Sequence, residues 1–235
     1  MRLNKDVEHP VDMPKLQSPF VREVVNGVYV CVPKINEKYR WAFTQEAEAT
    51  EKLDGTNVSI VVKDGKIISI YNRKNLIEPW KKGNKRFVEG ILESIEKEII
   101  DVEKLEDGQY FGELIGESVN GNPYRIKGHV WLPLSYLREH LRFKFWDDLV
   151  LELKGKSDEE IFKKVSQVFE GLWSLYKRKL GFEKTPVNRN VGFEGMAAEG
   201  IVFYRKGTDE MCKLRRDMFD WFVGKRHKED LKERI

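Results

Sequence analysis

The sequence predicts an α+β fold, with strands mostly in antiparallel pairs and helices inserted between them. Paired apolar runs joined by tight-turn residues, as in residues 57–72, are typical of antiparallel hairpins. Two other segments, 86–100 and 157–180, repeat apolar residues every three or four positions, which is typical of amphipathic helices. The order of these elements along the chain is the basis of the predicted class.

The first 45 residues contain no long predicted element. Prolines at positions 10, 14, 19 and 33 break them, although residues 28–32 could form a short strand. We expect residues 1–45 to be an N-terminal extension packed on the core, and residues 46–235 to be one main domain with a short helical tail. One domain is the default because the sequence has no internal repeat, low-complexity tract or Ser/Gly linker.

Residues 57–62 and 67–72 predict the first hairpin, because Asp64 and Gly65 between them accept the positive φ of a tight turn. Residues 86–100 follow as a helix whose apolar residues lie four apart. The next two predicted strands are the segment GQYFGELIG, residues 108–116, and residues 143–146.

The longest predicted helix covers residues 157–180. Ser157 and Glu160 form a capping box at its start. Its core stripe consists of Ile161, Val165, Val168, Leu172 and Leu175. The remaining predicted elements are a closing hairpin of residues 200–204 and 210–214, and a short helix from Arg216.

Composition and charge describe a globular protein with a heavily charged surface, since 40% of residues are hydrophobic and 34% are charged. The 42 basic and 39 acidic residues give a net charge of +3, so any surface that binds nucleic acid must be local. The N-terminus does not resemble a signal peptide and no run is long enough to span a membrane. Because Cys31 and Cys212 build no disulfide framework, we expect a cytoplasmic protein. Four histidines without metal-binding spacing argue against a structural zinc site.

Lys52 lies at the end of an apolar run, two residues before Asp54 and Gly55. A K-x-D-G run arises by chance in roughly one chain in twenty of this length, so a simple β-turn is one interpretation. The other is a nucleophilic lysine, with Gly55 leaving the backbone open to a ligand. A free lysine has a pKa of about 10.4, so such a site needs neighbouring positive charge or a bound metal.

Two strands each carry one carboxylate among apolar residues, Glu113 in GQYFGELIG and Glu199 in AEGIVF. Each alone could form a salt bridge, but two that face one pocket could bind ribose hydroxyls and orient a divalent cation. Lys213 and Arg215 lie two apart and hence on one face of a strand. With Arg73 they could bind a phosphate chain, or they could simply form an exposed basic face.

Taken in chain order, these residues resemble the motifs of covalent nucleotidyltransferases, which include ATP-dependent polynucleotide ligases and GTP-dependent mRNA capping enzymes. Lys52 to Asn57 resembles motif I, which carries the nucleotidylated lysine, and Arg73 resembles the arginine that follows it. Phe111-Gly112-Glu113 resembles motif III and Phe143 to Asp147 resembles motif IIIa. Glu199 to Phe203 resembles motif IV, and Lys213-Leu-Arg215 resembles motif V. No single match is specific, but the ordered set is.

Within this superfamily the sequence is most similar to RNA ligases of the RNA ligase 2 type. The Gly-Thr-Asn57 ending of motif I resembles these enzymes, whereas DNA ligases typically carry arginine there. Capping enzymes and most DNA ligases have an OB domain after motif V, but only twenty residues follow Arg215. The resemblance therefore implies an ATP-grasp-like ligase adenylation domain without a C-terminal OB domain.

The resemblance implies an ATP-dependent RNA ligase that joins 5′-phosphate and 3′-hydroxyl ends through a lysyl-AMP intermediate. Its catalytic residues would be Lys52, Lys213 and Arg215, and Glu199 would hold Mg²⁺ or Mn²⁺. Asp54 would orient Lys52 or stabilise the turn. The implied ATP-binding residues are Glu51, Asn57, Arg73, Glu113, Trp146, Glu199, Lys213 and Arg215.

Two positions depart from the family pattern. Arg215 stands where the family often has a second lysine, and arginine binds phosphate with a different geometry. Trp146 stands where a phenylalanine usually stacks on the purine, with Phe143 as the alternative.

Other functions remain open: a DNA-nick ligase, a GTP-dependent capping-type transferase, or an inactive nucleotidyltransferase fold that binds RNA. RNA ends are the expected partner. The candidate basic clusters for RNA are Lys81, Lys82, Lys85 and Arg86, and Lys225, Arg226 and Lys228.

Overall fold

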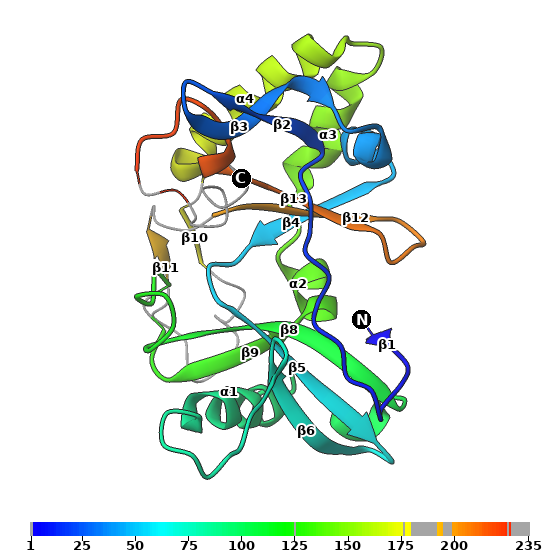
Figure 1. Cartoon of the computed structure of the whole chain (residues 1–235), viewed down its shortest axis with the longest axis vertical. Coiled ribbons are helices and arrows are strands. Elements are labelled where there is room, and N and C mark those ends of the chain that lie inside the picture. The colour runs from blue at the N-terminus through cyan, green and yellow to red at the C-terminus, as the bar shows by residue number, and fades with distance from the viewer. Residues whose placement is uncertain are drawn as a thin grey trace. The chain divides into compact units, whose positions relative to one another are not determined.

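The computed structural model describes residues 2–124, 126–175, 177–179, 192–194, 199–224 and 226. Contacts divide the chain into two compact units, each made of segments that are distant in the sequence (Figure 1). Unit 1 comprises Met1–Lys15, Leu53–Leu141 and Tyr176–Ala197, and unit 2 comprises Leu16–Lys52, Arg142–Leu175 and Ala198–Ile235. The predicted division at residue 45 stays a prediction.

Unit 1 contains an antiparallel sheet with the strand order β1-β8-β5-β6-β7, in which β9 also pairs with β8. The hairpin predicted for residues 57–72 is confirmed, and its turn residues Asp64 and Gly65 have φ angles of 49° and 67°. The strands are β1 (Arg2–Asn4), β5 (Thr56–Lys63), β6 (Lys66–Asn72), β7 (Asn75–Leu76), β8 (Gly108–Gly116) and β9 (His129–Pro133).

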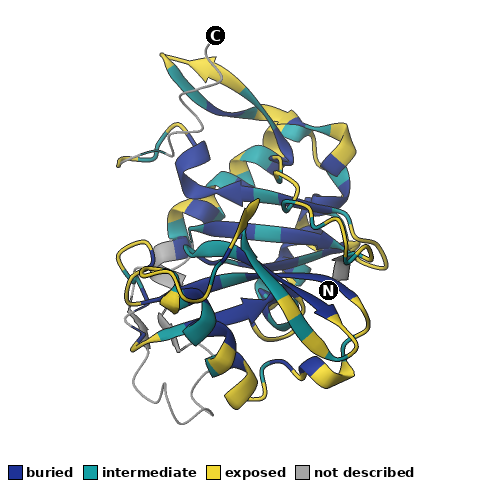
Figure 2. Ribbon diagram, turned by 60° about the horizontal axis from the view of Figure 1, so that its bottom comes forward, coloured by how far each residue is buried: buried dark blue, intermediate teal, exposed yellow. Residues whose placement is uncertain are grey.

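Helix α1 (Lys85–Glu96) packs against β9 and β8 and confirms the helix predicted near residues 86–100. Phe87 and Ile91 are buried in the core of unit 1 with Val58 and Trp131. Strands β5 and β8 are buried along most of their length (Figure 2). The other elements of this unit are η2 (Val102–Lys104), α2 (Leu134–His140) and the paired strands β10 (Lys177–Lys179) and β11 (Gly192–Glu194).

Unit 2 contains an antiparallel sheet with the order β13-β12-β4 and a separate hairpin of β2 and β3. The predicted closing hairpin is β12 and β13, and the predicted strand at 28–32 lies within β3, so both predictions are confirmed. The strands are β2 (Phe20–Val25), β3 (Val28–Ile35), β4 (Ala47–Lys52), β12 (Gly200–Arg205) and β13 (Met211–Arg215). The helical elements are η1 (Glu37–Phe43), α3 (Lys144–Leu153), α4 (Asp158–Leu175) and the short η4 (Arg216–Met218).

Helix α4 begins with the predicted capping box. The Ser157 N–H donates to Glu160 Oε2 at 2.8 Å, and the Glu160 N–H donates to Ser157 Oγ at 3.3 Å. Within the predicted stripe, Ile161, Val165 and Leu172 are buried. The helix ends at Leu175 rather than at residue 180, because residues 177–179 belong to β10.

The strand predicted for residues 143–146 is wrong, because α3 begins at Lys144. Its buried residues, Trp146, Leu149, Val150 and Leu153, follow the helical spacing of three or four. The Phe143 N–H donates to the Ala49 carbonyl at 2.8 Å, which ties the start of this helix to β4. A short apolar run does not distinguish a strand from the first turn of a buried helix.

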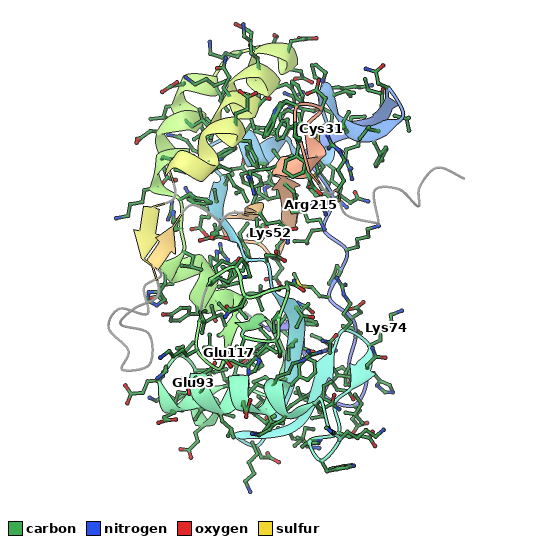
Figure 3. The ribbon with its side chains drawn as sticks, turned by 90° about the vertical axis from the view of Figure 1, so that its left-hand side faces the viewer. Cys31, Lys52, Lys74, Glu93, Glu117 and Arg215 are labelled. Atoms are coloured by element: carbon green, nitrogen blue, oxygen red, sulfur yellow. The ribbon has the colours of Figure 1, made fainter. Side chains whose placement is uncertain are left out.

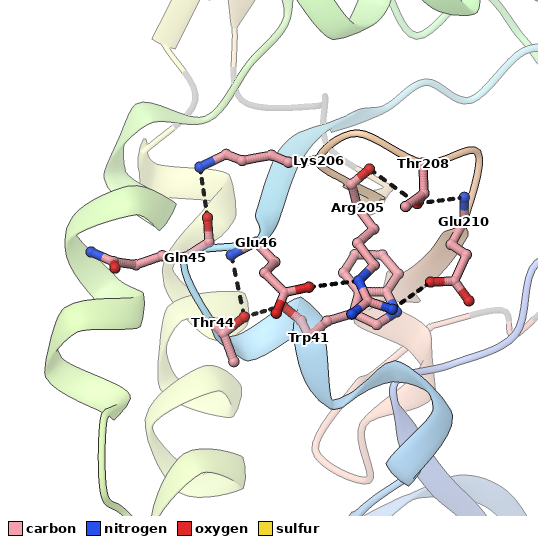
Figure 4. A network of polar contacts seen from close by, with 8 residues as sticks. All are labelled: Trp41, Thr44, Gln45, Glu46, Arg205, Lys206, Thr208 and Glu210. Atoms are coloured by element: carbon pink, nitrogen blue, oxygen red, sulfur yellow. Dashed lines mark hydrogen bonds and ion pairs between the residues drawn. The ribbon is translucent and has the colours of Figure 1, made fainter.

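An exposed network of charges joins the turn between β12 and β13 to the residues that precede β4 (Figure 4). Arg205 donates from Nε to Glu46 Oε2 at 2.6 Å and from Nη1 to Glu210 Oε2 at 2.8 Å. The Lys206 ammonium donates to the Gln45 carbonyl at 2.6 Å. Exposed ion pairs contribute little stability singly, so these contacts chiefly connect the turn after β12 with the residues before β4.

The predicted mixed architecture of antiparallel sheets and inserted helices is confirmed in both units. Within the described residues, none of the helices combines the length and apolar character that crossing a membrane requires.

Candidate active site

Lys52 and Arg215 lie on the two outer strands of the β13-β12-β4 sheet, opposite the same residue of the central strand. Gly200 pairs with Lys52 on β4 and with Arg215 on β13. Residues directly opposite each other in a sheet project from the same face. The pairing of three segments therefore places the predicted nucleophile and a predicted phosphate-binding arginine on one face, at one end of the sheet.

Gly200 is required at this position because β13 approaches it closely. A Cβ atom built on Gly200 would lie 2.1 Å from the Leu214 carbonyl oxygen and 2.7 Å from Arg215 Cα. Both obstacles are backbone atoms, so a side chain would force the strands apart.

Glu199, the residue before β12, lies between the two cations. Its Oε2 contacts Lys52 Nζ, and its Oε1 lies 3.8 Å from Arg215 Nε. The Lys52 and Glu199 side chains are 20% and 14% exposed, so this ion pair is largely shielded from water but remains reachable. Figure 3 shows Lys52 and Arg215 at neighbouring positions on this sheet. The predicted lysine, glutamate and arginine are therefore brought together.

Asp217 is a member of this cluster that the sequence analysis missed. Its Oδ1 accepts a hydrogen bond of 2.8 Å from Arg215 Nε, and the two side chains are 7% and 2% exposed. A buried guanidinium needs such an acceptor. The only signal in the sequence was an acidic residue two positions after Arg215, which is too common to identify a site.

The segment after β13 is fixed by two further arginines. The Arg216 N–H donates to the Glu199 carbonyl at 3.1 Å, and burial lowers the pKa of the Arg216 guanidinium to about 10. The Arg226 guanidinium donates to the carbonyls of Asp217, Phe219, Asp220 and Phe222. Arg226 therefore holds the turn after Asp217 rather than forming part of a free basic cluster, and Lys225 and Lys228 lie outside the described residues.

Lys213 projects from the same face of β13 as Arg215, two residues away, as predicted. It is half-buried, and its backbone N–H donates to the Gln17 carbonyl at 2.9 Å. A second cationic side chain thus accompanies Arg215 on the face that carries Lys52.

Glu51 and Trp146 lie on the other face of the sheet. Glu51 is buried and pairs with Ile201, the residue next to Gly200 on β12.

The Trp146 ring packs against Phe203 with 4.8 Å between centroids, and its Nε1 donates to the Ala42 carbonyl at 3.0 Å. Phe203 projects on the same face as Ile201. Trp146 is therefore a packing residue in this structure, and its predicted purine-stacking role stays a prediction, as does that of the buried Phe143.

Unit 1 contains the other predicted nucleotide-binding residues. Asn57 on β5 pairs with Glu113 on β8. Glu113 is half-buried whereas its neighbours along β8 are buried, so this acidic side chain keeps some contact with water within an otherwise apolar strand. Asn57 Nδ2 donates to the Gly112 carbonyl at 3.3 Å, and its buried Oδ1 accepts no hydrogen bond from the described residues.

Packing against β8 explains why a glycine stands at position 55, which the sequence did not reveal. A Cβ atom at Gly55 would lie 2.5 Å from the Leu114 carbonyl oxygen and 2.6 Å from Glu113 Cγ. The close approach of β8, rather than a ligand, excludes a side chain here.

Asp54 and Arg73 also lie in unit 1. Asp54 Oδ1 accepts a hydrogen bond of 2.8 Å from Asn120 Nδ2, and its N–H donates to the Tyr124 hydroxyl. These contacts favour the interpretation that Asp54 stabilises its loop. Arg73 has a positive φ of 54°, and its Nη1 lies 3.7 Å from Asp12 Oδ2.

Glu199 is the residue predicted to hold a metal ion. Among the residues that the structure describes, no three histidine, cysteine or acidic side chains form a preassembled metal site. Mg²⁺ is commonly bound through one or two carboxylates while it keeps several waters and contacts substrate phosphates. Glu199 beside Lys52 fits that mode of binding.

The chain matches the family model described as RNA ligase over residues 45–219. Among solved structures it is similar to Naegleria gruberi RNA ligase. The structure of a mutant of that enzyme with AMP and Mn is 18% identical in sequence, with a TM-score of 0.43. The match covers 91% of this chain and 60% of that chain. The enzyme with PPi is also 18% identical, with a TM-score of 0.42 and coverage of 92% and 60%. This chain thus spans about 60% of the length of these solved chains. No curated protein matches it.

Proposed function

Since the chain belongs to the RNA ligase family, we propose that it is an ATP-dependent RNA ligase in which Lys52 forms a lysyl-AMP intermediate. The observation that carries this proposal is the position of Lys52 beside Glu199 and on the same face as Arg215. A lysine in a simple surface turn would have no need of a shielded carboxylate and a buried arginine beside it.

In the first step the Lys52 amine attacks the α-phosphorus of ATP. A phosphorus–nitrogen bond forms, the bond to the β-phosphate oxygen breaks, and pyrophosphate leaves. Glu199 contacts the amine and can orient it for attack, and the proton that the attacking nitrogen loses passes to water. Lys213 and Arg215 stabilise the negative charge on the phosphate oxygens, because phosphoryl transfer depends mainly on positioning and on charge neutralisation.

In the next two steps AMP passes from Lys52 to the 5′-phosphate of an RNA end, and a 3′-hydroxyl then attacks that phosphate and releases AMP. A Mg²⁺ or Mn²⁺ ion held by Glu199 would supply further charge neutralisation. For the nucleotide we propose that Glu113 binds the ribose and that Arg73 binds near the ribose or the departing phosphates. Glu51 and Asn57 remain proposed nucleotide contacts, as does Trp146 or Phe143 for the purine.

The test is covalent labelling. The protein is incubated with Mg²⁺ and α-labelled ATP or GTP, separated on a denaturing gel, and digested for mass spectrometry to locate the label. We expect labelling from ATP on Lys52, loss of the label in Lys52→Ala, and retention of it in Lys63→Ala, an exposed lysine of β5. Label from GTP alone would favour a capping-type transferase, and no label from either would favour an RNA-binding protein without this chemistry.

Sealing assays then decide the substrate. We expect the protein to seal a nick, or to join two ends, when the strand that carries the 3′-hydroxyl is RNA. Joining should require a 5′-phosphate on the second end. Sealing of an all-DNA nick in preference to RNA would replace the RNA ligase assignment with that of a DNA-nick ligase.

A further inference from the structure

Trp80 is an aromatic residue that neither the core of unit 1 nor the proposed chemistry uses. It lies between β7 and α1, and 80% of it is exposed. Tryptophan is highly buried on average, and an exposed indole suits a residue that binds a partner.

The loop that presents Trp80 is held by its own hydrogen bonds. The Lys81 N–H donates to the Glu78 carbonyl at 3.0 Å, and the Asn84 N–H donates to the Lys81 carbonyl at 3.0 Å. Asn84 Nδ2 also donates to the Glu78 carbonyl, at 3.2 Å. Ile77 on one side and Phe87 on the other are anchored in the core. Trp80 therefore projects from a closed turn whose two ends are fixed.

Positive charge surrounds Trp80 in the sequence of this turn. We call Trp80, Lys81, Lys82, Lys85 and Arg86 the Trp80 surface. Lys81 and Lys85 form exposed ion pairs with Glu78 and Glu89, whereas Lys82 forms none within the described part of the chain. Four cations against two acidic partners leave a local positive charge that the chain as a whole, at +3, does not show.

An exposed aromatic side chain in the same short segment as several lysines matches the chemistry of a single nucleic-acid strand. Unpaired bases stack on aromatic side chains, and lysines contact the phosphates that follow. Bases within a duplex are already stacked on both sides and offer no face to Trp80. The positive charge also opposes a basic peptide as the partner.

We infer that the Trp80 surface binds a single-stranded segment of the RNA substrate, with Trp80 stacked on one base and Lys82 on the backbone. This inference rests on the proposed function, because it assigns a binding surface to the RNA that the enzyme would seal.

The test measures the Kd of the full chain for a fluorescently labelled single-stranded RNA by polarisation. Trp80→Ala should raise the Kd about 5- to 150-fold, and Trp80→Phe should restore most of the affinity. Leu151→Ala, which truncates an exposed apolar residue on α3, is the matched control and should leave the Kd unchanged. On an oligomer with the same phosphates but abasic sugars, Trp80→Ala should have no effect.

Salt dependence tests the charged part of the surface. Lys82→Ala should lower the slope of log Kd against log salt concentration by about 0.7, the release expected for one phosphate contact to a single strand. Lys154→Ala, an exposed lysine without an ion pair in the described part of the chain, should leave the slope unchanged.

Unchanged RNA affinity in Trp80→Ala would overturn the inference, and so would an equal loss on RNA and on the abasic oligomer. Trp80-dependent binding of an acidic peptide in place of RNA would overturn it as well, since it would assign the surface to a protein partner. Labelling of Lys52 is measured on each variant. If Trp80→Ala weakens RNA binding but the protein is never labelled, the ligase chemistry is refuted and the RNA-binding surface is supported. If Lys52 is labelled but Trp80→Ala does not change RNA binding, the ligase chemistry is supported and the RNA-binding surface is refuted.

Discussion

Glu199 is placed to influence two cations at once, and this sharing is the main feature of the site at the scale of residues. Its carboxylate contacts Lys52 and lies near Arg215, while Arg215 donates to Asp217. With both Glu199 and Asp217 beside it, the Arg215 guanidinium is held in one orientation. A phosphate-binding arginine fixed in this way loses little freedom when a phosphate arrives.

Asp217 should therefore act as a positioning residue. Asp217→Ala leaves the buried Arg215 without this acceptor, and removing one partner of a buried pair typically lowers the free energy of unfolding by about 3–5 kcal/mol. Asp217→Asn keeps an oxygen acceptor and should lose less. Urea unfolding measures stability, and the rate of Lys52 labelling against ATP concentration measures the effect on the site.

The positioning role predicts a specific kinetic pattern for the folded variants. The ATP concentration for half-maximal labelling should rise in Asp217→Ala and be largely restored in Asp217→Asn. If Asp217→Ala loses stability but labels at the wild-type rate and ATP concentration, Asp217 has only a structural role.

At the scale of elements, α4 is joined to β3 and η1 through Asp158. Its Oδ2 accepts a hydrogen bond of 2.9 Å from the Ile35 N–H, and its Oδ1 accepts one of 3.0 Å from Arg40 Nη2. The hydrogen bond from Ile35, and then those with Arg40, lower the pKa of the Asp158 carboxyl below its ordinary value of 3.8.

A carboxyl whose pKa is lowered by folding stabilises the protein above its unfolded pKa, and this contribution is lost as the pH falls through the lower folded value. Asp158→Asn should therefore lower the free energy of unfolding by about 1–3 kcal/mol at neutral pH and by less at an acidic pH below the lowered folded pKa. Urea unfolding at both pH values measures the difference. An equal loss at both would mean that the charge of Asp158 contributes nothing.

Helix α3 supplies Trp146 to the core of unit 2, and its replacement separates packing from nucleotide binding. Trp146→Ala should lower the free energy of unfolding by about 3–5 kcal/mol, and Trp146→Phe by less. Because the ring lies on the face opposite to Lys52, Trp146→Phe should keep the wild-type ATP dependence of labelling. A weaker ATP dependence with unchanged stability would instead support the predicted stacking role.

At the scale of the whole molecule, nucleotide choice should be visible without any chemistry. In Lys52→Ala, which cannot be labelled, ATP at 100 times its Kd should stabilise the fold by about 2.7 kcal/mol. For a chain of this size that raises the Tm by about 5–10 °C. A thermal shift with ATP and Mg²⁺ but not with GTP is expected; a larger shift with GTP would contradict the proposed specificity.

The sequence predicted those parts of the fold that depend on neighbouring residues. The β5–β6 hairpin follows from Asp64 and Gly65, and the start of α4 follows from Ser157 and Glu160. Residues 143–146 were assigned wrongly because four residues are too few to show a period. The pairing of β4 with β12 joins segments about 150 residues apart, so no local pattern could reveal that Gly200 lies between Lys52 and Arg215.

The residues of the candidate site likewise fall into those that the sequence could identify and those that depend on tertiary structure. The ordered motifs identified Lys52, Glu199, Lys213 and Arg215, which the sheet of unit 2 places at one end. Asp217 and Arg226 could not be identified, because their roles depend on how the chain turns after β13. The packing of Trp146 against Phe203 was likewise a tertiary contact that the spacing of aromatic residues does not encode.

The absence of room at Gly200 limits how this protein can change over evolution. Lys52 and Arg215 lie on the two strands that flank β12, and replacing Arg215 by lysine would keep a cation at that position. Gly200, which lies between them, has no such conservative replacement, because even the methyl group of alanine would meet the backbone of β13. Variation should therefore almost never be tolerated at Gly200, so that the least chemically reactive residue of the site would be as invariant as the nucleophile.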